Sequence, residues 1–319
     1  MSTETPGPDI TSRPSGRAAR ERMYRYVLLL CAAASILVTV SIVVLLARDA
    51  VTFFTLVNPV DFFTGTEFLI SRNVYGLLPL LSGTLLVTVI SAVIALPTGV
   101  AAAVYLSEYA SEQMRSVLKP GLEILAGIPT VVYGIFALVY VTPFLQTIGL
   151  PVNTFNILSA SIMVGIMIIP MVSSLSEDAM SAVPDSLRQA GYGMGATKFE
   201  VTTGVVVPAA ASGIFSSFIL ALSRAIGETM IVVVAMGAQA RMPAVREAIF
   251  GIPYINPADI LLESGMTITV AMVQIAGGDL TGGTIPYDSM FALGLTLFVV
   301  TLVMNVLSDI IAERYREEY

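Results

Sequence analysis

Histidine and tryptophan are absent from this sequence, and its single cysteine, Cys31, lies inside an apolar run. One cysteine excludes an intrachain disulfide, and no cluster of histidines or cysteines is available to ligate a metal ion. Acid–base catalysis by histidine is excluded as well. The sequence also lacks a G-x-x-x-x-G-K-[ST] loop, so the chain does not bind ATP through such a loop. We therefore expect no catalytic residue, no metal site and no cofactor in this chain.

Charged residues are also scarce. They make up 12% of the 319 residues, whereas 55% are hydrophobic. A typical soluble domain has about 25% charged residues. This composition predicts an all-α, multi-pass protein of the plasma (inner) membrane, surrounded by lipid and without a nucleic-acid partner.

Six apolar stretches are long enough for transmembrane helices, each of which needs about 20 residues. They cover residues 27–47, part of 77–107, two parts of 124–176 on either side of a turn at 146–156, the segment from Pro208 to about Gly237, and 289–308. The shorter uncharged run 264–278 predicts a re-entrant or interfacial helix instead of a seventh span.

Lysine and arginine set the orientation, because cytoplasmic loops are enriched in them. With the N-terminus inside, eleven of these residues fall in cytoplasmic segments and four in outer segments. Both termini are therefore predicted to be cytoplasmic. The cytoplasmic set is Arg13, Arg17, Arg20, Arg22, Arg25, Arg115, Lys119, Arg188, Lys198, Arg314 and Arg316, and the outer set is Arg48, Arg72, Arg241 and Arg246.

The chain divides into four regions on this basis. Residues 1–25 are predicted to be a disordered basic cytoplasmic tail, because they are rich in Pro, Ser, Thr, Gly and Arg. Residues 26–73 hold the first span and an outer loop, 74–310 the main transmembrane domain, and 311–319 a cytoplasmic C-terminal tail.

The polar, glycine-rich stretch 184–208 is predicted to form two short helices separated by a bend. Pro184 suits the start of the first helix, and Gly193 and Gly195 allow the bend. Thr197 and Glu200 have the spacing of a capping box that begins the second helix. Pro208 limits how far that helix continues without a kink. An ordinary polar connector would explain the composition equally well.

One charged pair lies inside a predicted span. Arg224 and Glu228 are four residues apart, so on a continuous helix they share a face and can form an ion pair. Arg224 follows Pro208 by 16 residues, or about 24 Å of helix, which places it well inside the bilayer. A charge there costs roughly 3 kcal/mol or more and normally faces a partner or a polar cavity. The pair is either a packing element or part of an oxyanion pathway, since the arginine fork suits an oxyanion.

The stretch 184–208 resembles the cytoplasmic EAA loop of ABC importer permeases. The family pattern is Glu-Ala-Ala, three residues, Gly, nine residues and Ile-x-Leu-Pro. Its spacing is matched throughout, although Gln189 replaces the glutamate and Gly191 the second alanine. The matching positions in this sequence are Gln189, Ala190, Gly191, Gly195, Val205, Val207 and Pro208.

Further segments narrow the resemblance to phosphate permeases, and within them to the PstC type. Residues 125–134 read Leu-Ala-Gly-Ile-Pro-Thr-Val-Val-Tyr-Gly, close to the family's AGIPSVVYG segment. Residues 224–230 read Arg-Ala-Ile-Gly-Glu-Thr-Met, similar to the family's fifth-span signature. The resemblance covers about residues 74–310 and implies a MetI-like permease core preceded by one extra N-terminal span. It implies structural roles for Gly127, Pro129, Tyr133 and Gly134.

The resemblance also implies a division of labour. A phosphate-binding protein outside, a second homologous (PstA-like) permease and two copies of an ABC ATPase would be partners, with ATP and magnesium bound by the ATPase. Residues implied to contact that ATPase or shape the loop are Gln189, Ala190, Gly191, Gly195, Thr197, Glu200 and Pro208. Arg224 and Glu228 would line the substrate path. A permease for sulfate, molybdate or tungstate, the PstA-like subunit itself, and a membrane-embedded enzyme are the alternatives.

Overall fold

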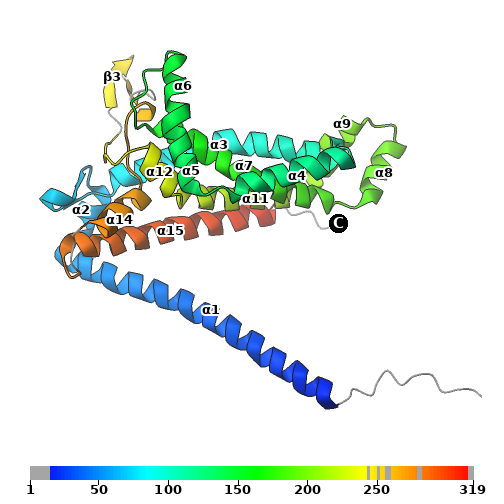
Figure 1. Ribbon diagram of the computed structural model, residues 1–319, viewed down its shortest axis with the longest axis horizontal. Helices are drawn as coiled ribbons and strands as arrows, with labels where there is room; N and C mark the ends of the chain where they lie inside the picture. Colours follow the sequence, from blue (N-terminus) through cyan, green and yellow to red (C-terminus); the bar gives the residue numbers. More distant parts are fainter. Residues whose placement is uncertain (1–14, 243–244, 250–251, 256–259, 279–281, 315–319) are drawn as a thin grey trace, which may run out of the picture.

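The computed structural model describes residues 15–242, 245–249, 252–255, 260–278 and 282–314, and within them it is mostly helical (Figure 1). Five helices are long and apolar enough to cross a membrane, and a pair of helices bent by 67° is a sixth candidate. In chain order these candidates are Arg20–Leu56, Leu78–Tyr109, Thr130–Thr147, Ile157–Ser181, the pair Lys198–Ala209 and Ala211–Ile226, and Ile285–Leu307. The all-α class is confirmed, and each predicted span falls on one of these candidates.

Helix α1 spans Ser15–Leu56 and is longer than predicted. Residues 15–25 are helical, so this part of the predicted tail is not disordered, whereas residues 1–14 lie outside the described part of the chain. The helix diverges from the rest of the molecule and is exposed along most of its apolar length (Figure 1). Near its C-terminal end it meets α15 (Ile285–Arg314), where Leu46 lies against Gly294.

A cluster of aromatic rings fixes the segment between α1 and α3. This segment contains α2 (Pro59–Thr64), a 3₁₀ turn (Ile70–Arg72) and the two-residue strands β1 (Phe68–Leu69) and β2 (Val74–Tyr75), which pair antiparallel. Phe53 and Phe62 are fully buried, with ring centroids 5.6 Å apart. Edge-to-face ring pairs of this kind add to the energy of apolar burial. This segment is therefore packed onto the end of α1.

Helices α3 (Leu78–Val104) and α7 (Ile157–Ser181) form the centre of the bundle. Small residues let their backbones approach closely. A Cβ atom added at Gly99 would lie 2.7 Å from Val172, and the Ser91 hydroxyl donates to the Ser161 carbonyl at 2.9 Å. Among the five single helices that are long enough to cross a membrane, α7 is the most extensively buried.

The predicted tight turn between the third and fourth spans is confirmed. Helices α4 (Glu112–Gly127), α5 (Thr130–Phe136) and α6 (Thr142–Thr147) precede it, with a π-helical turn at Ala137–Val141. The turn ends at Asn156, whose side chain accepts the Ser159 backbone N–H at 2.7 Å and so caps α7.

The remaining elements lie at two ends of the bundle (Figure 1). One end holds α8 and α9, together with the C-terminal end of α15. The opposite end holds α2, the short helix α14 (Ile268–Gly277) and the antiparallel hairpin of β3 (Val245–Ile249) and β4 (Ile252–Ile255). Because α14 has only 10 residues, it is not a full span by length, and its re-entrant position in the membrane stays a prediction.

A close backbone contact positions the segment that leads into α14. A Cβ atom added at Gly83 of α3 would lie 2.2 Å from the backbone oxygen of Met266, which cannot move without displacing the chain. The Ile268 backbone N–H also donates to the Thr84 hydroxyl at 3.1 Å. Glycine at position 83 is therefore needed for this packing.

We predict that Gly83→Ala lowers the free energy of unfolding by about 1–3 kcal/mol, the usual range for overpacking. A thermal melt of the purified protein in detergent, followed by size-exclusion chromatography, measures the change. Gly121→Ala is the matched control, because no atom lies within 4 Å of a Cβ added there. Equal melting temperatures for Gly83→Ala and the wild type would contradict the assigned packing.

Candidate coupling surface and transport pathway

The stretch 184–208 folds into two short helices, as predicted. Helix α8 spans Asp185–Gly193 and α9 spans Lys198–Val201. Gly195, between them, has a φ of 84°, in the left-handed region that favours glycine. The capping box is confirmed: the Thr197 hydroxyl accepts the Glu200 backbone N–H, and the Glu200 carboxylate accepts the Thr197 N–H at 2.7 Å.

One face of this loop is exposed and partly apolar. Gln189 and Ala190 are exposed on α8, whereas Gly191 is buried against Val201 of α9. Three large side chains that the sequence analysis did not single out are exposed here: Tyr192, Met194 and Phe199. Met194 is 83% exposed, more than the other exposed large apolar side chains of the described residues. We call Gln189, Ala190, Tyr192, Met194 and Phe199 the coupling surface.

Beyond α9 the chain does not continue as a straight helix. A π-helical turn (Thr202–Val206) and α10 (Val207–Ala209) lead to a break at Ala210, and α11 (Ala211–Ile226) leaves at an angle of 67°. Pro208 lies in α10, directly before the break. The uninterrupted 24 Å helix that we inferred between Pro208 and Arg224 is therefore wrong, although the expected limit near Pro208 is confirmed.

The predicted ion pair between Arg224 and Glu228 does not form. Helix α11 ends at Ile226, Gly227 follows it, and a new helix, α12 (Met230–Ala235), begins after Thr229. The Glu228 carboxylate instead accepts the backbone N–H of Ile231 at 3.2 Å, and its own backbone oxygen accepts the Thr269 hydroxyl at 2.9 Å. Glu228 is 8% exposed, and its bond to Ile231 supports the start of α12.

Arg224 is left without an acidic partner among the described residues. It is exposed near the end of α11, and its guanidinium contacts the sulfur of Met167 at 3.9 Å. The neighbouring Ser223 donates to the Asn305 side chain of α15 at 2.6 Å, which holds this part of α11 in place. An unpaired guanidinium on a membrane-spanning helix normally faces a polar cavity or a partner.

The segment 125–134 contains a further helix break. Gly127 ends α4 and Pro129 precedes α5. The Tyr133 hydroxyl donates to the Leu125 carbonyl at 2.7 Å, across the break. A Cβ atom added at Gly134 would lie 2.9 Å from Val234 and 3.2 Å from the Ile231 Cα, so Gly134 allows α5 to pack closely on α12.

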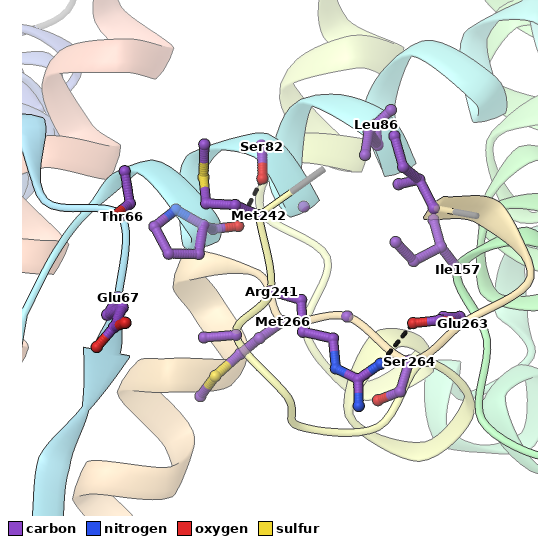
Figure 2. Close-up of a pocket in the computed structure, with 15 residues that line it drawn as sticks. Thr66, Glu67, Ser82, Leu86, Ile157, Arg241, Met242, Glu263, Ser264 and Met266 are labelled. Atoms are coloured by element: carbon purple, nitrogen blue, oxygen red, sulfur yellow. Dashed lines mark hydrogen bonds and ion pairs between the residues drawn. The ribbon is translucent and has the colours of Figure 1, made fainter. Parts of the chain in front are cut away.

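A cavity of about 500 Å³ lies between the start of α3 and the segments 240–242 and 263–266 (Figure 2). Arg241 points into it and pairs with Glu263 at 2.5 Å, on the side away from Thr66 and Glu67. The charged residues of its lining are these two carboxylates and one guanidinium. The net charge of these three groups is negative and does not favour an anion. Arg224 therefore stays the candidate for the pathway.

A buried charge cluster ties α4 to α7. Glu177 is fully buried, and its carboxylate pairs with Arg115 and, at 2.9 Å, with Lys119. The hydrogen bond from Lys119 to Glu177 is the main reason that the pKa of Lys119 is raised. The sequence did not single out Glu177, because its approach to residues about 60 positions earlier has no local signal.

The chain is similar to known transport proteins in both sequence and fold. Several relatives resemble almost the whole chain. A phosphate transport system permease protein PstC of Xylella fastidiosa (strain Temecula1) is 31% identical and covers 98% of each chain. A probable ABC transporter permease protein of Bacillus subtilis is 30% identical, covering 96% of this chain and 94% of the relative. A PstC of Mesorhizobium japonicum is 32% identical over 72% of this chain and 71% of its own.

Solved structures support the fold alone, because their sequence identities are low. A bacterial alginate ABC transporter, solved with an alginate-bound periplasmic protein, matches with a TM-score of 0.64 and 15% identity. The match covers 96% of this chain and 99% of that one. The MetNI methionine transporter in an inward-facing form matches with a TM-score of 0.52 and 18% identity, over 75% and 94% of the two chains. The expected MetI-like core is confirmed.

The family model for the inner membrane component of binding-protein-dependent transport systems matches residues 95–317. This range includes the helix breaks at 127–129, Ala210 and 227–229, the coupling surface and Arg224, and it covers most of the chain. With its long apolar helices, the chain is a membrane protein that belongs to this family, the permease subunits of ABC importers.

Proposed function

We propose that this chain is the PstC-type permease subunit of an ATP-driven phosphate importer and forms half of its translocation path. The observation that carries the proposal is one bent segment, with an exposed coupling surface at one end and Arg224, which lacks an acidic partner, on the following helix. Relatives named PstC support phosphate as the substrate. A permease for another oxyanion and the PstA-like partner subunit are the alternatives.

The coupling surface docks on a separate ATPase, of which the importer has two copies. The exposed Met194 and Phe199 supply apolar area for a protein interface, where Met, Phe and Tyr are common. Gln189 makes a neutral contact where the family has a glutamate. ATP and Mg²⁺ are bound by that ATPase, and this chain receives its motion.

Arg224 attracts the oxyanion within the membrane. A guanidinium presents paired N–H donors that fit phosphate, and the Met167 sulfur is too weak an acceptor to compete. Binding has to be weak enough for release. A phosphate-binding protein outside delivers the ion, and a second, PstA-like permease completes the path around Arg224.

Uptake of radiolabelled phosphate into vesicles tests the substrate directly. The vesicles contain this chain with its ATPase, partner permease and binding protein. We expect uptake that depends on ATP and that excess unlabelled phosphate abolishes. Sulfate and molybdate are expected to compete poorly. If either competes as well as phosphate, the assignment changes to an oxyanion permease of another kind.

We predict that Gly195→Asp abolishes transport-coupled ATP hydrolysis while the protein still reaches the membrane. An aspartate there must adopt a φ near 84° and adds a charge beside the coupling surface, which turns α8 relative to α9. ATP hydrolysis with and without the loaded binding protein is the measurement. Gly204→Asp is the matched control, because Gly204 is exposed on the same loop with a helical backbone and nothing within 4 Å. Normal transport-coupled ATP hydrolysis in Gly195→Asp would contradict the proposed role of this stretch in coupling.

We predict that Arg224→Gln lowers the phosphate uptake rate about tenfold, a loss of about 1.4 kcal/mol of stabilisation at the barrier. Arg224→Lys keeps the charge without the fork and is expected to retain part of the rate. Initial rates in reconstituted vesicles at equal protein levels measure both. Arg224 is structural if the glutamine variant keeps both its rate and its preference for phosphate over sulfate.

A further inference from the structure

Arg188 of α8 binds four acceptors at the start of the stretch 184–208. Its Nη1 donates to the Val183 carbonyl at 2.5 Å and to Asp185 at 3.1 Å. Its Nη2 donates to the Met180 carbonyl at 2.8 Å and to Glu108 at 3.2 Å. A single planar guanidinium thus joins three elements of the bundle, which a lysine could not do with one ammonium group.

The contact between Arg188 and Glu108 is well shielded from water. The Arg188 side chain is 15% exposed and that of Glu108 is 6% exposed, whereas the Asp185 side chain is 85% exposed. Ion pairs with little access to water are costly to break from one side, because the remaining charge is left without a partner. The pair with Asp185 is an exposed pair and contributes little.

The elements joined by Arg188 include the cytoplasmic ends of the two central helices. Met180 lies in the last turn of α7, so the guanidinium satisfies carbonyls that the end of that helix leaves free. Glu108 belongs to the π-helical turn Tyr105–Tyr109, which continues α3. The Ser107 hydroxyl also donates to Glu108 at 3.1 Å and helps to orient the carboxylate.

Two further contacts bring the loop to the same end of α3. The Lys198 ammonium of α9 lies 5.0 Å from the centre of the Tyr109 ring, a cation–π contact. Beneath both contacts is an apolar cluster of buried residues from α3, α7, the loop and α11. It consists of Ala103, Met180, Val183, Val201, Val206, Ala210 and Ile214. The loop is therefore packed on α3 and α7 as well as being continuous with α11.

We propose that Arg188 is a positioning residue that transmits movement of α8 directly to α3 and α7, through its ion pair with Glu108 and its bonds to the end of α7. The proposal rests on the proposed function, because it needs an ATPase to move α8. The bend of 67° at Ala210 makes the covalent route through α9 and α11 indirect. The Arg188 side chain is only 15% exposed and its guanidinium is bound within the chain, so it serves transmission and not docking.

The test is the number of phosphate ions taken up per ATP hydrolysed in vesicles that contain the complete importer. We expect Arg188→Gln and Glu108→Gln each to lower this ratio about tenfold, within the range usual for coupling between sites. Basal ATP hydrolysis and co-purification of the ATPase are expected to stay near the wild-type values. The ratio in the double variant should be no lower than in Arg188→Gln alone, because both changes remove the same ion pair between residues 188 and 108.

Asp185→Asn is the matched control, because it removes the exposed partner of the same guanidinium. It should keep the wild-type ratio. A wild-type ratio in both Arg188→Gln and Glu108→Gln overturns the transmission role, whereas absence of uptake by the wild type overturns the proposed function itself. If Arg188→Gln does not fold, Glu108→Gln and Arg188→Lys decide the question, and a lowered ratio with an unchanged melting temperature supports transmission.

Discussion

The rule that governs this molecule is that a backbone N–H or carbonyl inside a hydrocarbon layer must find its partner within the protein. The chain breaks its helices repeatedly, and at the two central breaks a side chain supplies what the helix has lost. At residues 227–229, Glu228 accepts the Ile231 N–H and Thr269 donates to the Glu228 carbonyl. At residues 127–129, Tyr133 donates to Leu125. These breaks are therefore stable features of the bundle, and they lie on helices that pack together, α5 and α12.

Proline accounts for the position of two π-helical turns by the same rule. Pro143 and Pro208 each follow a π-helical turn, Ala137–Val141 and Thr202–Val206 respectively. A proline lacks the N–H that a helix needs, and its ring collides with the carbonyl four residues earlier. In both cases that carbonyl lies inside the π-helical turn, where the wider backbone moves it out of the way. Pro208 thereby helps to set where the loop ends and the bent span begins.

Local signals in the sequence were sufficient to predict the two helices of the stretch 184–208 and insufficient to predict the geometry around Arg224. The capping box of Thr197 and Glu200 depends on residues three apart, so its spacing alone predicted it. Arg224 and Glu228 also had a suitable spacing, but their ion pair required an unbroken helix. Gly227 lies between them, and α12 is held by α5 and α14, which are remote in the sequence. Tertiary contacts decided the outcome, and the sequence pattern did not contain them.

The charged contacts had no local signal, for a related reason. Arg188 and Glu108 are 80 residues apart, and Glu177 is about 60 residues from Arg115 and Lys119. The positive-inside rule counted these basic residues as topology signals. In the fold, Arg188 and the Glu177 pairs have a second role, because they bind α3, α4, α7 and α8 to one another at one end of the bundle.

This distribution of charge separates rigid parts of the chain from parts that can bend. Glu177 is fully buried, so moving α4 away from α7 would leave a carboxylate without its cations, which is costly. The same argument holds for Glu108 and Arg188. Among the described residues, no ion pair crosses Ala210 or the break at 227–229. The buried ion pairs therefore do not oppose a bend at these two breaks, which lie on either side of Arg224.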